Sequence, residues 1–140
     1  MDNRTIIQQS LDYIEENLQT EITATELADT AGFSLFHYYR LFQQATGLPV
    51  MQYILRRRLL HGVYAMKQGS TKIDAALSFG FDTYAGFYKA FCREFGSAPS
   101  EFLRSGRVSL SGIIRTRLSG RLIRSDCFLF IDGRQPICFI

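Results

Sequence analysis

AGFSLFHYYRLF, residues 31–42, is a stretch that this 140-residue sequence repeats in altered form. The second version is FGFDTYAGFYKAF, residues 79–91. In both versions a glycine separates the end of one predicted helix from the start of another, which carries several aromatics and a cation. Five residues after its last phenylalanine, each version is followed by a further glycine, Gly47 or Gly96. Because internal repetition indicates repeated structural units, the sequence predicts two helix-turn-helix units.

Capping signals place the helices of the first unit, which we expect over about residues 5–48. Thr23 and Glu26 have the spacing of a capping box, in which a hydroxyl and a carboxylate satisfy the first amides of a helix. Gly32 lies where that helix must end with a positive φ, and Ser34 can cap the next helix. A supporting helix before them is predicted from an apolar stripe of Ile7, Leu11, Ile14 and Leu18.

A long linker helix is predicted over about residues 49–67. Pro49 suits its start, where a missing amide hydrogen is harmless. At 1.5 Å per residue the helix would be roughly 28 Å long, near the length of one DNA turn (~34–36 Å). Gly62 in its middle predicts a close approach by another helix, because a mid-helix glycine costs roughly 1 kcal/mol. The side chains of Arg56–Arg58 cannot share one face, so we expect one to support the fold and one or two to reach phosphate.

The second unit is predicted over about residues 71–104. Thr71 can cap its first helix, Gly80 repeats the turn, and Asp82 or Thr83 can cap the next helix. A short helix closes the unit. The side chains expected to be buried are Ile73, Ala76 and Leu77 in the first of these helices, and Phe87, Phe91 and Phe102 in those that follow.

The composition changes beyond Gly106, where β-type residues mix with serine, glycine and arginine. Two apolar runs, Cys127–Ile131 and Ile137–Ile140, flank Asp132-Gly133, a pattern that predicts a β-hairpin. An unpaired apolar strand at a chain end favours aggregation. We therefore expect residues 106–140 to be either the start of a truncated sensor domain or a segment that pairs in a dimer.

Composition is typical of a folded protein of the cytoplasm. The hydrophobic fraction of 46% and the aromatic fraction of 14% suffice for a packed core. Three cysteines without CxxC spacing indicate reduced thiols, and favour neither a disulfide framework nor a metal site. Neither a signal sequence nor an apolar run of ~20 residues is visible, so we expect no secretion and no membrane insertion. We also expect no cofactor.

Charge is segregated along the sequence. Residues 1–30 contain seven acids and one base, a net charge of −6, whereas residues 31–104 carry +5 and residues 105–140 carry +4. Phosphate binding needs a positive face, which the middle and end of the chain can supply and the first helices cannot. Ordinary solvated charge is an equal alternative on this evidence alone.

Several motifs at matching separations resemble the DNA-binding domain of the AraC/XylS family of bacterial transcription regulators. The family's second-unit signature is similar to I-x-x-I-A-x-x-x-G-F, then F-x-x-x-F, then G-x-x-P-x-x-[YF]-[RL]. The matching segments here are residues 73–81, 87–91 and 96–103. Arg58-Leu59, Gly62 and Ala65-Met66 also resemble the family's linker helix, in which Ala is usual in place of Gly62. The resemblance covers about residues 5–104.

The resemblance implies a mainly α fold of about seven helices. Residues 1–105 would form two helix-turn-helix subdomains joined by the long linker helix, and the short β-like segment at residues 106–140 would follow. The implied partners are double-stranded DNA, RNA polymerase, and a small-molecule effector bound through a C-terminal domain that is not fully present.

The resemblance also implies that the second helix of each unit reads DNA. Its reading positions are Phe36, His37, Tyr39 and Arg40 in the first unit, and Thr83, Tyr84, Ala85, Gly86, Tyr88 and Lys89 in the second. Arginine can donate two hydrogen bonds to guanine, lysine can reach guanine or phosphate, and an aromatic ring can contact thymine methyls. Four aromatics cannot all point inward from one helix, so Tyr38 and Phe42 are expected in the core. His37 is either a DNA contact or a solvated residue.

The predicted function is sequence-specific transcriptional regulation, with two recognition helices in successive major grooves of an asymmetric site. Small side chains at Ala85 and Gly86 predict that the second unit reads less sequence than the first, or lets its backbone approach DNA closely. A helical protein–protein adaptor that uses the exposed aromatics and the C-terminal hairpin is the alternative. No cysteine cluster, Ser/His/Asp arrangement, carboxylate pair or phosphate loop is visible in the sequence, so we predict no enzymatic activity.

Overall fold

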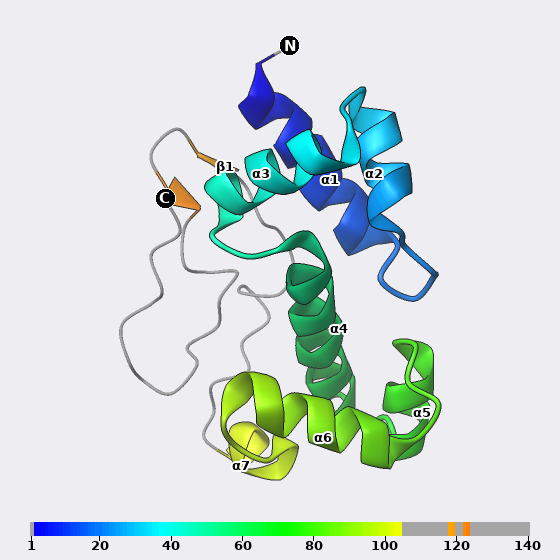
Figure 1. The fold of residues 1–140 in the computed structure, drawn as a ribbon. Coiled ribbons are helices and arrows are strands. Elements are labelled where there is room, and N and C mark those ends of the chain that lie inside the picture. Colours follow the sequence, from blue (N-terminus) through cyan, green and yellow to red (C-terminus); the bar gives the residue numbers. More distant parts are fainter. Residues whose placement is uncertain (1, 105–117, 120–121, 124–140) are drawn as a thin grey trace.

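The computed structural model describes residues 2–104, 118–119 and 122–123, and its fold is mainly α (Figure 1). Its helices are α1 (Asn3–Glu16), α2 (Ala24–Ala31), α3 (Leu35–Thr46), α4 (Val50–Lys67), α5 (Lys72–Ser78), α6 (Tyr84–Phe95) and α7 (Pro99–Arg104). A short antiparallel pair, β1 (Leu118–Ser119) and β2 (Leu122–Ile123), places Leu118 opposite Ile123. The predicted seven-helix fold is confirmed, whereas the hairpin predicted at residues 127–140 lies outside the described residues. Among the described helices, none has the length and apolar character of a membrane span.

The helices form two groups at opposite ends of α4 (Figure 1). α1, α2 and α3 pack against one another near its start, and α5, α6 and α7 pack around its end. Most buried side chains of each group form a separate cluster, and Phe79, which follows α5, belongs to the first of the two. Because α4 contributes Ile54 to the first cluster and Val63 to the second, one helix carries both groups.

Capping interactions define the helix ends of the first unit as predicted. The Thr23 hydroxyl accepts a hydrogen bond from the Glu26 amide at 3.2 Å, and the Glu26 carboxylate accepts one from the Thr23 amide at 3.3 Å. Gly32 follows with a φ of 76°, a left-handed conformation that costs a residue with a β-carbon roughly 1–2 kcal/mol. Ser34 then caps α3 by accepting from the His37 amide. These local interactions fix where α2 ends and where α3 begins.

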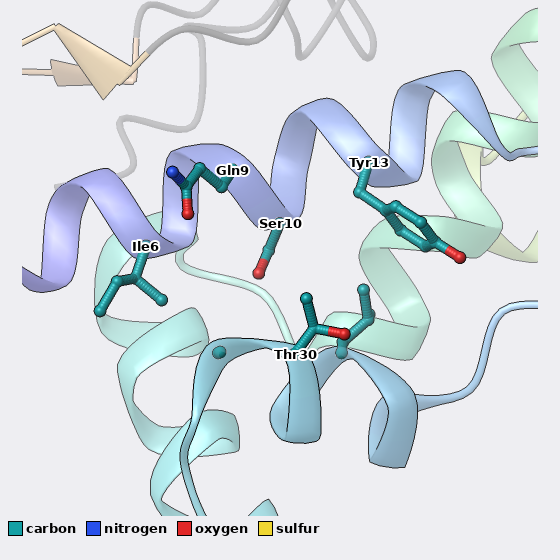
Figure 2. Close-up of a pocket in the computed structure, with 7 residues that line it drawn as sticks. Ile6, Gln9, Ser10, Tyr13 and Thr30 are labelled. Atoms are coloured by element: carbon teal, nitrogen blue, oxygen red, sulfur yellow. The ribbon is translucent and has the colours of Figure 1, made fainter. Parts of the chain in front are cut away.

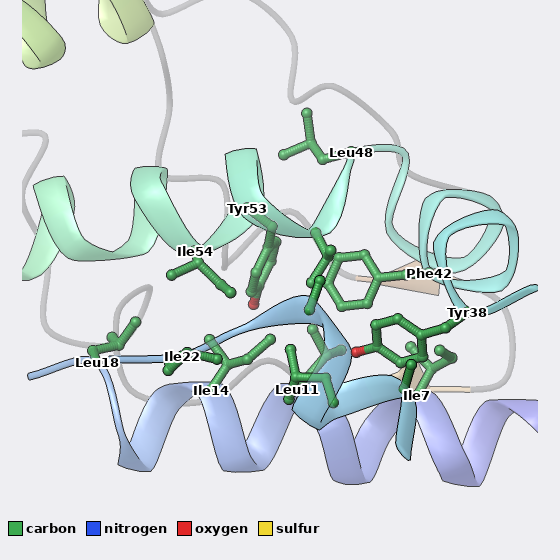
Figure 3. Packing of buried hydrophobic residues seen from close by; sticks show 14 of the residues in the cluster. Ile7, Leu11, Ile14, Leu18, Ile22, Tyr38, Phe42, Leu48, Tyr53 and Ile54 are labelled. Atoms are coloured by element: carbon green, nitrogen blue, oxygen red, sulfur yellow. The ribbon is translucent and has the colours of Figure 1, made fainter. Parts of the chain in front are cut away.

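Tyr38 and Phe42 point from α3 into the core of the first unit (Figure 3). Both are fully buried, so the prediction that they belong to the core is confirmed. They pack with the apolar stripe of α1, which includes Leu11, and the Phe42 ring centroid lies 5.5 Å from that of Tyr53 on α4. With these two rings inside, the other aromatics of α3 must face outward.

The buried face of α5 differs from the prediction. Ile73 and Leu77 expose 62% and 53% of their surface, whereas Ala75 and Ala76 are buried. The face of α5 that packs against α4 and α6 is the one that carries the two alanines. Two small side chains also let α5 lie close to α4. The prediction for Ala76 is confirmed, and those for Ile73 and Leu77 are wrong.

A buried ion cluster holds α1 against α4. The Arg57 side chain is 1% exposed and donates to both carboxylate oxygens of Glu15, with Nη2 and Oε2 3.1 Å apart. His61 Nε2 lies 3.0 Å from the same carboxylate. Burial would raise the pKa of Glu15, but the His61 hydrogen bond and the Arg57 charge outweigh it and lower the pKa. Glu15 is therefore ionised at neutral pH and ties the two helices together.

The neighbouring arginines also have intramolecular partners. Arg58 donates to the carbonyls of Leu18 and Thr20 at 3.0 and 2.7 Å. Arg56 donates to the carboxylate of Glu94 on α6 at 3.2 Å. The expectation that one of Arg56–Arg58 supports the fold is confirmed, but all three bind within the protein. This differs from the expectation that one or two of them reach phosphate.

The close approach predicted at Gly62 is confirmed. A Cβ at this position would lie 2.5 Å from Cε2 and 2.9 Å from Cζ of Phe87. Phe87 is fully buried and belongs to the cluster around the end of α4. α6 therefore lies against α4 at the position where α4 has no side chain.

Candidate nucleic-acid interface

An outward stripe on α3 contains most of the residues predicted to read DNA in the first unit. Phe36, Tyr39 and Arg40 have the spacing i, i+3, i+4, which places them on one face of the helix. All three are exposed, Phe36 to 72%. His37 is exposed beside this stripe. The predicted exposure of these four residues is confirmed.

Two contacts with aromatic rings restrict the positions of Arg40 and His37 on this face. The Arg40 guanidinium carbon lies 5.8 Å from the centroid of the Phe36 ring, within the range of a cation–π interaction. The His37 ring packs edge-on against Phe33, with the ring centroids 4.8 Å apart. The guanidinium is thus held over an exposed ring while Arg40 itself stays exposed. Its fork of donors can pair with two acceptors on a base edge or a phosphate.

α6 presents smaller side chains than α3 does. The Thr83 hydroxyl accepts from the Gly86 amide at 3.1 Å, so it serves as the N-cap of the helix. Ala85 and Gly86 are exposed in the first turn and have no side-chain donors. A Cβ at Gly86 would meet only Thr83 Oγ1, at 3.4 Å, which is ordinary contact. Lys89 is the exposed cation one turn further along.

Two tyrosines flank the exposed face of α6. Tyr84 is half-buried, and Lys72 Nζ of α5 lies 5.5 Å from its ring centroid. Tyr88 is exposed, and charge repulsion from the Cys92 side chain together with a hydrogen bond to it raises the pKa of Tyr88. A tyrosine is protonated at neutral pH in any case, so the Tyr88 hydroxyl is available there as a hydrogen-bond donor. Of the ten residues predicted to read DNA, nine are exposed and Tyr84 is half-buried.

Two further exposed residues extend these faces and were missed by sequence reasoning. Gln43 lies one turn after Tyr39, and Arg93 lies one turn after Lys89. Gln43 also lines a surface pocket together with Tyr39 and Met51. The i, i+4 spacing from a predicted residue is the signal that could have identified both.

A different surface of the first unit lies outside this interface. Figure 2 shows a small pocket between α1 and α2. It is lined by Ile6, Gln9, Ser10, Tyr13, Leu27, Thr30 and Ala31. Exposed acids on the same two helices include Asp12, Glu16 and Asp29. Because this charge repels phosphate, the surface formed by α1 and α2 does not belong to the candidate interface.

Comparison with known proteins shows what this arrangement is similar to. A family model described as a helix-turn-helix domain matches residues 27–105, which is more than half of the chain. The HTH-type transcriptional activator AarP of Providencia stuartii is 32% identical over 97 residues, covering 69% of this chain and 72% of AarP. The chain spans between 39% and 58% of the length of the first three curated relatives it matches.

Solved structures share the fold. A transcriptional regulator of Chromobacterium violaceum described as containing an AraC-type DNA-binding domain matches with a TM-score of 0.66 at 22% identity, covering 76% of this chain and 95% of that one. The DNA-binding domain of AdpA, solved in complex with a target DNA, matches with a TM-score of 0.63 at 22% identity, covering 72% of this chain and 92% of that one. A probable AraC family transcriptional regulator of Rhodopseudomonas palustris matches with a TM-score of 0.61 at 31% identity, covering 72% of this chain and 96% of that one. With its two helix-turn-helix units at the ends of α4, the chain belongs to the AraC family of helix-turn-helix transcriptional regulators.

Proposed function

We propose that residues 1–105 are the DNA-binding domain of a sequence-specific transcriptional regulator, and that α3 and α6 enter successive major grooves of one asymmetric site. The observation that carries this proposal is that α3 and α6 lie at opposite ends of α4. Each has an exposed face with an outward cation, Arg40 or Lys89. A major groove admits one α-helix and presents a distinct donor and acceptor pattern for each base pair. The AdpA domain, which has this fold, is solved on a target DNA.

The exposed side chains of α3 suit base recognition. We assign Arg40 to a guanine edge, because its donors can pair with O6 and N7, and Phe36 to a thymine methyl group. Tyr39 and Gln43 lie on the same exposed face and His37 lies beside it, and all three side chains can bond to bases or phosphates. This set makes α3 the main reader of sequence.

α6 contributes more to affinity than to base choice in this proposal. Lys89 and Arg93 follow each other at one-turn spacing and can contact a guanine edge or phosphates. The side chains at the start of α6 are small at Thr83, Ala85 and Gly86, which lets the backbone approach DNA. Tyr84 and Tyr88 flank this stretch. Because the two helices differ, the site read by one chain is asymmetric. RNA polymerase is the proposed partner through which the bound protein regulates transcription.

A mobility-shift titration with salt tests the proposed function. DNA bearing a site selected by the protein is titrated between about 50 and 200 mM salt, over which each phosphate contact should add a slope of about −0.9 to log K against log salt. We expect steep weakening with salt, and a shallower slope for Lys89→Ala. A protein that shifts no DNA, or whose binding is indifferent to salt, would contradict the proposal and favour a protein–protein adaptor.

A further inference from the structure

Three polar side chains join α4 to the C-terminal end of α6, and we call them the Glu94 clamp: Gln52, Arg56 and Glu94. The Glu94 carboxylate accepts from Gln52 Nε2 and from Arg56 Nε, both at 3.2 Å. The Glu94 and Arg56 side chains are only 11% and 15% exposed, so water screens their interaction weakly. The Arg56 guanidinium carbon also lies 5.9 Å from the ring centroid of Phe95, the last residue of α6. The clamp therefore holds the C-terminal end of α6 against α4.

Apolar packing and the Glu94 clamp both join α6 to α4. Phe91 and Phe95 of α6 share a buried cluster with residues of α4, Phe87 contacts Gly62, and the Glu94 clamp adds a polar contact at the end of α6. Phe87 and Glu94 are seven residues apart, which is about 10 Å along a helix. Apolar side chains can slide over one another, whereas a hydrogen bond to a charged group depends on direction. The clamp thus adds to the apolar packing a directional contact at the end of α6 that is far from Phe87.

The other side of α4 is tied to the first unit. Arg57 and Arg58, the residues directly after Arg56, bind the Glu15 carboxylate and the carbonyls that follow α1. Successive helix residues point about 100° apart, so the three arginines brace α4 on different sides within one turn. The direction of α6 is therefore fixed relative to the group that contains α3.

We infer that the Glu94 clamp sets the spacing of the two DNA half-sites that the protein accepts. This inference rests on the proposed function, and the clamp residues act in it as positioning residues that do not touch DNA. One base pair inserted between the half-sites turns the second by about 34–36°, since a helical turn contains about 10–10.5 base pairs. A fixed α6 cannot follow that turn, whereas an α6 freed from the clamp can follow it in part. Because the clamp fixes the direction of α6, the protein binds weakly to sites in which the half-sites have the wrong spacing.

Binding to sites of altered spacing tests the inference. The full chain selects its site from random DNA, one base pair is inserted or deleted between the two halves, and the Kd for each DNA is measured by mobility shift. We expect the affinity of the wild type for DNA of altered spacing to be about tenfold or more below its affinity for the native spacing. The affinity of Arg56→Ala for DNA of altered spacing should be only about threefold or less below its own affinity for the native spacing. Lys67→Ala, which removes an exposed cation from the same helix, is the matched control and should keep the wild-type ratio.

Two more variants separate positioning from general damage to the fold. Glu94→Gln keeps the shape of the side chain but loses its charge, so it should also relax the spacing ratio, and it carries the test if Arg56→Ala does not fold. The charge-swapped pair Arg56→Glu with Glu94→Arg should restore the ratio. An unchanged ratio in folded Arg56→Ala and Glu94→Gln overturns the inference, as does a wild type that binds its selected site but tolerates any spacing. A wild type that selects no site overturns the proposed function as well.

Discussion

Gly62→Ala perturbs the contact through which α6 lies against α4. The added Cβ would lie 2.5 and 2.9 Å from two ring carbons of Phe87, far inside the ~3.5–4.0 Å of a favourable carbon–carbon contact. The ring is fully buried, and its centroid lies 5.2 Å from that of Phe81 and 6.1 Å from that of Phe91. Phe87 therefore has little room to move away from the new methyl group.

The magnitude follows from two opposing effects. Overpacking a buried site costs about 1–3 kcal/mol, whereas replacing a mid-helix glycine by alanine gains about 1 kcal/mol. Because the Phe87 ring is confined, we expect a cost at the upper end and a net destabilisation of about 1–2 kcal/mol. Urea unfolding of the full chain, followed by far-UV circular dichroism, measures it. Gly86→Ala is the matched control, since its Cβ makes one ordinary contact, and it should lose no stability.

A double-mutant cycle isolates the contact. In a Phe87→Leu background the ring is absent, so Gly62→Ala should be neutral or stabilising there. Equal or greater stability of Gly62→Ala in the wild-type background would refute the reasoning. So would the same loss of stability in both backgrounds, because the clash would then have another partner.

The remaining predictions concern the ion cluster between α1 and α4. Arg57→Ala should lower the free energy of unfolding by about 3–5 kcal/mol, because it leaves the largely buried Glu15 carboxylate without its arginine. Urea unfolding measures this, and Glu16→Ala, which removes an exposed acid from the same helix, should change stability by less than about 0.5 kcal/mol. The folded pKa of Glu15 lies below its ordinary value of 4.5, so its contribution to stability is fully present above pH 4.5 and is lost as pH falls through the folded pKa. Glu15→Gln should flatten the acid limb of stability against pH, and an unchanged acid limb would show that Glu15 is not its source.

Local interactions are the part of the fold that could be predicted from the sequence. The capping box of Thr23 and Glu26, and the cap at Ser34, join residues three positions apart, so both partners lie in one short stretch. Gly62 was informative for a different reason, since a residue that weakens a helix indicates that something needs its space. That its partner is Phe87 depends on the fold and could not be predicted.

Features that depend on orientation or on distant partners could not be predicted. α5 has only seven residues, so two faces were compatible with its apolar pattern, and packing against α4 and α6 buries Ala75 and Ala76 instead of Ile73 and Leu77. The partners of the arginines are 38 to 42 positions away in the sequence, and only the packed fold brings them together.

The candidate interface, too, could be predicted from the sequence only in part. Placing Tyr38 and Phe42 in the core was enough to predict that Phe36 and Arg40 are exposed. Gln43 was missed because the motif that identified the reading positions ends before it, although it shares their helix face. Which base or phosphate each exposed side chain contacts stays a prediction.

Selection of bound sites from random DNA, performed with the wild-type chain and with Arg40→Ala, is the measurement that matters most. We predict an asymmetric motif in two parts about 10–10.5 base pairs apart, with the stronger base preference in the part read by α3. Arg40→Ala should relax the preference at one position of that part, by about 1–3 kcal/mol. An unchanged motif with Arg40→Ala would show that Arg40 reads no base. A wild type that selects no motif would contradict sequence-specific recognition by these two helices.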